Sequence, residues 1–270
     1  MLFRRTIFIG IDPTAGKRPM AYAALDRDLR LHCLDKGDYE EIAAYVGGQE
    51  NAFVAICGPQ RPNQGLMKRA EVRENLNPVP RSGRWRGFRV GEYQLYQHKI
   101  RTPRTPAQEE DCAAWMQTSF ALYRRLKKMG YQNYPHQDDA HQVQDDAHQV
   151  QDGGHQLLEV YPHGAFTTLL ESIPFKKDTL EGRLQRQLVL HNLGLDVPDP
   201  MRIFDQITRY RLMQGILPLD GLYSTDELDA IVAAYTAWVA AIRPGDVTVL
   251  GDPTEGEIVL PVKVLRKVYV

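Results

Sequence analysis

The stretch Thr6-Ile7-Phe8-Ile9-Gly10-Ile11-Asp12-Pro13, close to the N-terminus, decides how the fold is interpreted. Its nearly continuous apolar run is typical of a central strand that is covered on both faces. Asp12 ends the run, and Pro13 keeps Asp12 extended because its ring disfavours a helical backbone at the preceding residue. A carboxylate at the end of a buried strand is costly to bury. The stretch therefore predicts a central strand and a candidate functional acid.

The segments that follow alternate between strand and helix patterns. Capping boxes at Asp38 with Glu41 and at Ser224 with Glu227 mark the starts of two helices. Apolar runs and helical spacing define the other elements of an α/β fold. We expect strands at residues 19–25, 29–34, 52–57, 157–161, 258–260 and 262–270, and helices at 38–48, 108–129, 180–193 and 224–242.

The composition is that of an ordinary globular protein. The chain has 270 residues, 43% of them hydrophobic, with 33 Lys and Arg against 34 Asp and Glu. This balance excludes a wholly disordered chain and a uniformly basic nucleic-acid coat protein. The three cysteines have neither a metal-ligand spacing nor a disulfide framework, which fits a reducing compartment. No apolar run reaches the ~18 residues of a membrane span, so we expect a cytoplasmic protein without a membrane partner.

Two segments differ in composition from the rest of the chain. Residues 60–107 are rich in arginine and poor in aliphatic residues, so we expect a long insertion loop there. Residues 135–156 hold a repeat of about seven residues built from Gln, Asp, Ala, His and Val. The histidines of this low-complexity repeat permit a metal-binding tract. We favour a solvated, disordered linker, because its aspartates and glutamines supply no core.

Three carboxylates stand in apolar segments, where burying a charged group costs free energy. Asp12 ends a buried-type strand, Glu159 lies inside the apolar Leu157–Tyr161 strand, and Asp229 lies on the apolar face of the last helix, with Asp226 one turn earlier. If the two strands are neighbours and the helix crosses them, these acids converge. Convergent carboxylates repel one another, and a divalent cation relieves that repulsion. Their oxygen atoms suit Mg²⁺ or Mn²⁺, and two such ions support phosphodiester cleavage.

Each of these acids also has a purely structural interpretation. Asp12 can cap the turn that follows its strand, and Glu159 can form an ion pair with an arginine. Asp226 and Asp229 can stabilise the helix electrostatically, because negative charge is favourable near a helix N-terminus. We favour the functional interpretation for the set as a whole. It makes Asp12, Glu159 and Asp229 catalytic, and it makes all four acids metal ligands.

Basic residues gather in two places along the chain. Residues 67–104 hold ten Lys and Arg against three Glu, with Trp, Phe and Tyr interleaved. Arginine binds phosphate in a bidentate manner, and aromatic rings stack on unpaired bases. A solvated loop anchored by its aromatics is the alternative interpretation. The residues expected to bind phosphate or nucleic acid are Arg84, Arg86, Arg89, Lys176, Lys177, Arg183 and Arg186.

Several short motifs, in this order, resemble one known family. They are Gly10-Ile11-Asp12, Ile56-Cys57-Gly58-Pro59, Glu159-Val160-Tyr161-Pro162, Lys176-Lys177, Gly182-Arg183, Arg186, Asp226, Asp229-Ala230 and Glu255-Gly256-Glu257-Ile258-Val259-Leu260-Pro261. The chain resembles the family called domain of unknown function 429, whose members are described as predicted nucleases of RNase H-like fold. The resemblance implies a single RNase H-like domain over residues 1–270, with a mixed five-stranded sheet flanked by helices.

One position departs from the family pattern. The family usually has an aspartate at the end of the fourth strand, where this chain has Cys57. A thiol is a poor ligand for Mg²⁺, so one coordinating group is lost. Three functions stay open. The first is a metal-dependent nuclease or phosphodiesterase, and the second is a catalytically weakened protein that binds nucleic acid or a nucleotide. The third, an actin-like phosphotransferase, is disfavoured. That architecture needs two RNase H-like halves, and the sequence shows the motifs of only one.

Overall fold

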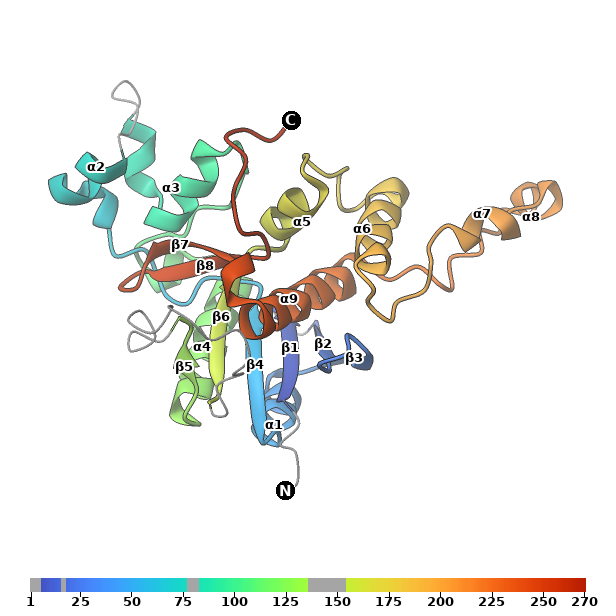
Figure 1. The fold of residues 1–270 in the computed structure, drawn as a ribbon, viewed down its shortest axis with the longest axis horizontal. Coiled ribbons are helices and arrows are strands. Elements are labelled where there is room, and N and C mark those ends of the chain that lie inside the picture. The colour runs from blue at the N-terminus through green and yellow to red at the C-terminus, as the bar shows by residue number, and fades with distance from the viewer. Residues whose placement is uncertain (1–5, 16–17, 77–82, 136–153) are drawn as a thin grey trace.

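The computed structural model describes residues 6–15, 18–76, 83–135 and 154–270 (Figure 1). In this part of the chain eight strands form one mixed sheet in the order β3-β2-β1-β4-β6-β8-β7, with β5 paired to β6. The strands are β1 Thr6–Asp12, β2 Met20–Leu25, β3 Leu31–Gly37, β4 Asn51–Ile56, β5 Gln132–Asn133, β6 Gln156–Val160, β7 Thr248–Asp252 and β8 Gly256–Leu260.

The direction of the strands brings distant segments to one edge of the sheet. β1, β4, β6 and β8 are parallel to one another, while β2, β3 and β7 pair antiparallel with their neighbours. Ile11 of β1 pairs with Ile56 of β4, and Ile56 pairs with Glu159 of β6. Asp12, Cys57 and Glu159 therefore meet at the carboxyl edge, although about 150 residues of sequence separate the first from the last.

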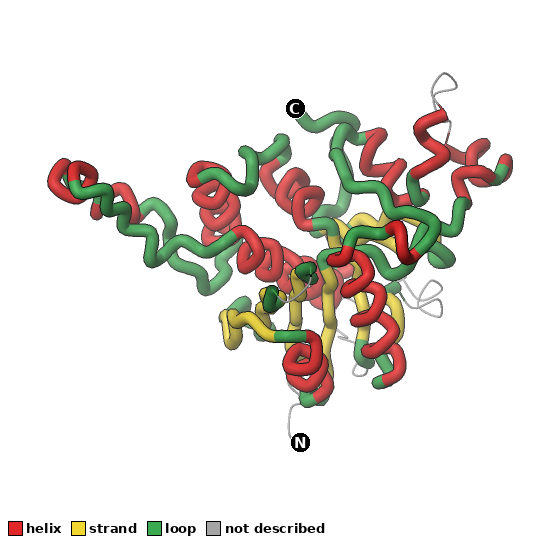
Figure 2. The backbone as a smooth tube through the Cα atoms, turned by 180° about the vertical axis from the view of Figure 1, so that it is seen from behind, coloured by secondary structure: helices red, strands yellow, loops and turns green. Residues whose placement is uncertain are grey.

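Helices cover both faces of the sheet. Apolar side chains of α1 and α4 pack with Ile7, Ile9 and Ile11 on one face, which Figure 2 shows from their side. α9 packs with α5, α6 and Phe8 on the other face. The helices are α1 Tyr39–Gly47, α2 Ala70–Leu76, α3 Val90–Gln97, α4 Ala114–Lys128, α5 Pro162–Leu170, α6 Leu180–Asn192, α7 Arg202–Gln206, α8 Arg209–Met213 and α9 Thr225–Ile242.

α9 approaches β1 so closely that only glycine fits at position 10. A Cβ atom on Gly10 would lie 1.9 Å from the carbonyl oxygen of Ala230 and 2.4 Å from the amide nitrogen of Ala234. Asp12 is two residues further along the strand, so it shares this face and lies ~7 Å beyond Gly10. Asp226 is four residues, or about 6 Å, before Ala230 along the helix. The close packing therefore aligns Asp12 with the first turns of α9.

The expected strands up to 157–161 are confirmed as β1, β2, β3, β4 and β6, and the one at 258–260 is β8. The described sheet is larger than the five strands expected, because β5, β7 and β8 extend it. The strand expected at 262–270 is wrong. This tail instead folds back, so that Tyr269 is buried beside Leu95 of α3 and its amide bonds to His98.

The two compositionally unusual segments differ in how far the structure describes them. Residues 60–107, expected as a loop, contain α2 and α3 and two short 3-10 helices. Tyr93 and Leu95 of α3 are buried, so a few apolar residues are enough to dock this helix. Most of the repeat, residues 136–153, lies outside the described residues. None of the described helices is both long and apolar enough to span a membrane.

Candidate functional site

A cavity of about 630 Å³ lies at the carboxyl edge of the sheet. The ends of β1, β4 and β6 supply its floor through Asp12, Cys57 and Glu159. The first turns of α9 supply Asp226 and Asp229, and residues 174–177 close another side. This is the edge at which open α/β sheets bind their ligands. The cavity is therefore lined by all four acids singled out by sequence.

Asp12 and Asp229 form the acidic centre of this cavity. Asp229 is 6% exposed, and Asp12 is partly buried. Burial and repulsion from Asp229 and Asp226 raise the pKa of Asp12 well above its usual range. Burial also raises the pKa of Asp229, although the nearby cation of Lys177 acts in the opposite direction. Among the described residues, none donates a hydrogen bond to the Asp12 carboxylate. Ionisation of both acids is therefore disfavoured, and a positive charge bound between them would relieve this.

Two cations approach these acids from the rim. The Nζ atom of Lys177 lies 3.2 Å from Oδ2 of Asp229, and attraction to Asp229 raises the pKa of Lys177. The guanidinium of Arg18 lies 3.3 Å from Oδ2 of Asp226. The side chains of Lys177 and Arg18 are 50% and 75% exposed, so solvent weakens both pairs. Either cation is free enough to turn toward a bound anion.

Glu159 forms a buried ion pair with Arg89. Its two carboxylate oxygens accept hydrogen bonds from Nη1 and Nη2 of Arg89, and Oε2 also accepts one from the amide of Gln60 at 3.1 Å. The Nε atom of Arg89 donates to Glu92 at 3.0 Å, and Nη1 donates to the Glu255 carbonyl at 3.1 Å. The side chains of Arg89 and Glu159 are each 3% exposed. Burial alone would lower the pKa of Arg89, but Glu159 and Glu92 raise it.

This buried pair changes what both residues can do. Arg89 was expected to bind phosphate and Glu159 to bind metal, yet each already has the other as its partner. Arg89 comes from the segment 60–107, so the pair fastens that segment to β6. Opening it would leave an uncompensated buried charge, which is strongly unfavourable. The structural interpretation of Glu159, an ion pair with an arginine, is the one that its contacts match.

The other arginines singled out by sequence lie in different surroundings. Arg183 donates to the carbonyls of Leu222 and Tyr223, both at 2.8 Å. Arg186 borders the cavity, but its Nη1 atom donates to the carbonyls of Phe175 and Gly182. Arg86 stacks over the ring of Trp85, 5.3 Å from its centroid. The side chain of Arg84 lies outside the described residues. Lys176 is exposed at the cavity rim.

Cys57 and His163 complete the inner wall as neutral groups. The thiol of Cys57 donates to the Asp229 carbonyl at 3.4 Å, and burial, Asp12 and Asp229 raise the pKa of Cys57 well above its usual range. Burial and the cations of Arg186 and Lys177 lower the pKa of His163 to about 4. At neutral pH both side chains are therefore uncharged, and the charge of the cavity comes from its carboxylates, lysines and arginines.

The donor set fits a divalent ion only in a limited way. Within residues 6–15, 18–76, 83–135 and 154–270, no group of three or more His, Cys, Asp and Glu side chains is arranged to hold a metal ion. Mg²⁺, however, is commonly held by one or two carboxylates together with water and substrate phosphates. Asp12 and Asp229 provide two such carboxylates, and Asp12 accepts no hydrogen bond from a described residue. An ion that a phosphate helps to hold suits this site, whereas a closed protein cage does not.

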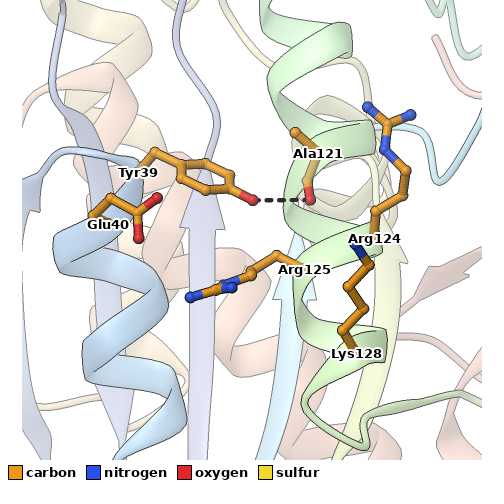
Figure 3. A pocket seen from close by; sticks show the side chains of 6 residues that line it. All are labelled: Tyr39, Glu40, Ala121, Arg124, Arg125 and Lys128. Atoms are coloured by element: carbon orange, nitrogen blue, oxygen red, sulfur yellow. Dashed lines mark hydrogen bonds between the residues drawn. The ribbon is translucent and has the colours of Figure 1, made fainter.

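A second, smaller depression of about 310 Å³ lies between α1 and α4 (Figure 3). In Figure 3 the Tyr39 hydroxyl donates to the Ala121 carbonyl at 3.1 Å. Arg124 lines this depression and is paired with Glu109, at 2.9 Å from each carboxylate oxygen. The depression contains one acid, Glu40, and lies on the face of the sheet opposite α9. It does not share the acidic pair, so the chemistry of the site belongs to the larger cavity.

Some cavity residues were given no functional role on the basis of the sequence. Tyr161 and His163 follow directly after β6, and the rule that ligands bind beyond the carboxyl ends of parallel strands points to them. Trp115 at the start of α4 and Phe175 before α6 also line the cavity. No local pattern marks these two aromatics, because only the tertiary fold brings them to this edge.

The fold and the cavity define a class: an α/β protein with two enclosed carboxylates where three parallel strands end. Within that class, the chain belongs to the family described as "Protein of unknown function (DUF429)", whose model matches residues 10–255. The matched region includes Asp12, Cys57, Glu159 and Asp229. No curated protein matches the chain.

Proposed function

We propose that the chain is a divalent-metal-dependent hydrolase of phosphodiester bonds, a nuclease or related phosphodiesterase of RNase H-like fold. The strand arrangement supports this fold, since three antiparallel strands are followed by β4, which lies parallel beside β1, and by β6, which lies parallel beside β4. One observation carries the proposal. Asp12 and Asp229, 217 positions apart in the sequence, share one cavity and raise the cost of each other's charge. The partners in this proposal are nucleic acids or nucleotides, and the location is cytoplasmic.

In this proposal Asp12 and Asp229 hold the ion, and Asp226 assists. Mg²⁺ or Mn²⁺ would supply Lewis acidity and an activated water to the bond that breaks. The two carboxylates gain from such an ion, because burial and mutual repulsion disfavour their ionised forms. Glu159 is left out of the ligand set, because Arg89 already neutralises it inside the protein.

Lysines provide the phosphate contacts. The pKa of Lys177 is raised, so the side chain stays protonated at neutral pH. Its half-exposed ammonium group can leave Asp229 for a phosphate oxygen when an ion neutralises that acid. Lys176 is exposed at the rim, where it can attract a polyanion. His163 stays neutral, and its ring nitrogens can hydrogen-bond water or an ester oxygen.

A cleavage panel tests this function. We expect Mn²⁺- or Mg²⁺-dependent cleavage of at least one substrate among single-stranded DNA, duplex DNA, RNA and an RNA–DNA hybrid. Asp12→Asn abolishes the cleavage, whereas Asp220→Asn, at an exposed aspartate outside the cavity, does not. A wild-type protein that binds Mn²⁺ but cuts no substrate with either metal would contradict the proposal.

A second function is favoured by a different observation. Cys57 stands at the end of β4, where an acid was expected, and its thiol bonds to the Asp229 carbonyl. Glu159 is an acid, but it is already paired with Arg89. A catalytically weakened protein that binds nucleic acid or a nucleotide would have this arrangement. The panel separates the two functions, because the second predicts retention of a labelled oligonucleotide without any product.

A further inference from the structure

We infer that the cavity takes one nucleotide unit, so that the substrate is a free nucleotide or the end of a single strand rather than the interior of a duplex. This inference rests on the proposed function, because it names the substrate class of the same site. It follows from the burial of the acids, the size of the cavity and one exposed aromatic side chain on a fixed backbone.

The two acids lie inside a cavity of limited size. Asp229 is 6% exposed, and Asp12 is partly buried. The cavity volume of about 630 Å³ falls within the range of small-molecule sites. A cube of that volume has sides of about 9 Å, which is narrower than the ~12 Å major groove of B-form DNA alone. The cavity therefore has room for one nucleotide unit of a single strand but not for a duplex.

Phe175 provides a place for the base. Its side chain lines the cavity, yet the residue is 57% exposed. The backbone beneath it is fixed, because its amide donates to Gln185 Oε1 at 2.8 Å and its carbonyl accepts from Arg186 Nη1 at 2.9 Å. An exposed aromatic ring on a fixed backbone loses little entropy when a base stacks on it. Stacking of this kind tolerates any base, because every base has a π-face.

The residues after Phe175 extend the match to a nucleotide. Lys176 follows at the rim, and its carbonyl accepts hydrogen bonds from the amide and hydroxyl of Thr179, at 3.2 Å and 2.9 Å. A Cβ atom on Gly182 would lie 2.0 Å from that same carbonyl, so the segment is pressed against α6. Lys177 then reaches Asp229. Three consecutive residues thus offer a stacking surface, a phosphate contact and a link to the acidic pair.

The first arm of the test compares substrate ends. The intact protein is incubated with Mn²⁺ and either a linear single-stranded DNA or a covalently closed circle of the same sequence. We expect the linear strand to be shortened and the circle to stay intact. Cleavage of the circle at a similar rate would overturn the inference while leaving the proposed function standing. If neither DNA is cut, the proposed function fails for DNA, and the second arm decides the inference alone.

The second arm measures binding of adenosine 5′-monophosphate by calorimetry, with and without Mn²⁺. We expect Phe175→Ala to weaken binding about tenfold or more, because base–aromatic stacking is lost. Phe175→Trp restores the affinity. Phe204→Ala is the matched control, since Phe204 is 53% exposed but lies on α7 outside the cavity. Undetectable binding by the wild type, or equal binding by the Phe175→Ala and Phe204→Ala variants, would overturn the inference.

Discussion

Replacing Arg89 by methionine tests the buried ion pair. The variant removes the arginine that pairs with Glu159 and also the bonds to Glu92 and the Glu255 carbonyl. Breaking a buried pair by removing one partner typically costs about 3–5 kcal/mol. Because Arg89 serves two carboxylates at 3% exposure, we expect about 4 kcal/mol. Methionine keeps much of the apolar volume, so the loss reports mainly on charge and hydrogen bonds.

Urea unfolding, followed by tryptophan fluorescence, gives the free energy of unfolding. Arg86→Met is the matched control, because Arg86 is an exposed arginine of the same segment that stacks over Trp85, and such contacts contribute about 0.5–1 kcal/mol. Adding Glu159→Gln to Arg89→Met should recover part of the loss by removing the unpaired charge. An Arg89→Met variant no less stable than Arg86→Met would refute this account and return Glu159 to the candidate metal ligands.

Three further changes probe the alignment and charge of the site. Gly10→Ala forces a Cβ atom against the Ala230 carbonyl, so we expect thermal unfolding to show a loss of about 3 kcal/mol of stability. Gly245→Ala is the control, because a Cβ atom there would have no neighbour within 4 Å, and it should be nearly neutral. Equal losses in the two variants would contradict the close packing of α9 on β1. The raised pKa of Asp12 predicts that Asp12→Asn increases Tm at pH values above the folded-state pKa of the wild-type carboxyl. This gain should vanish toward acidic pH, where the wild-type carboxyl is protonated, and a pH-independent difference would contradict the prediction. Cys57→Asp adds a third acid beside Asp12, so it should lower Tm in the absence of metal and enlarge the rise in Tm that Mn²⁺ causes. A rise in Tm with Mn²⁺ equal to that of the wild type would contradict this prediction.

Much of the frame could be predicted from the sequence because its signals are local. The apolar run of β1 and the capping box of Ser224 with Glu227 mark the two elements that carry Asp12 and Asp229. The small residues on one face of α9 suggest that this helix packs closely on β1 and brings the two acids together. The contact of Gly10 with the backbone of α9, which aligns them, is visible only in the structure. Both acids were therefore within reach of sequence analysis.

The partner of Glu159 could not be predicted, because it depends on a long-range contact. Arg89 lies 70 positions earlier, in a segment whose arginines suggest a solvated loop. Its burial follows from α3, which docks through few apolar side chains, so the segment shows little hydrophobic periodicity. The place of Phe175 in the cavity could not be predicted for a similar reason, since only the fold brings this residue there.

Calorimetric titration with Mn²⁺ tests the central claim most directly, because it needs no knowledge of the substrate. Loss of an outer partner of a ligand costs about 10–100-fold in metal affinity, so loss of a ligand itself should cost more than ~10-fold. We predict that the wild type binds Mn²⁺, that Asp12→Asn and Asp229→Asn each weaken binding by at least that factor, and that Asp220→Asn binds as the wild type does. Absence of Mn²⁺ binding by the wild type, or unchanged affinity in the Asp12→Asn and Asp229→Asn variants, would contradict the account.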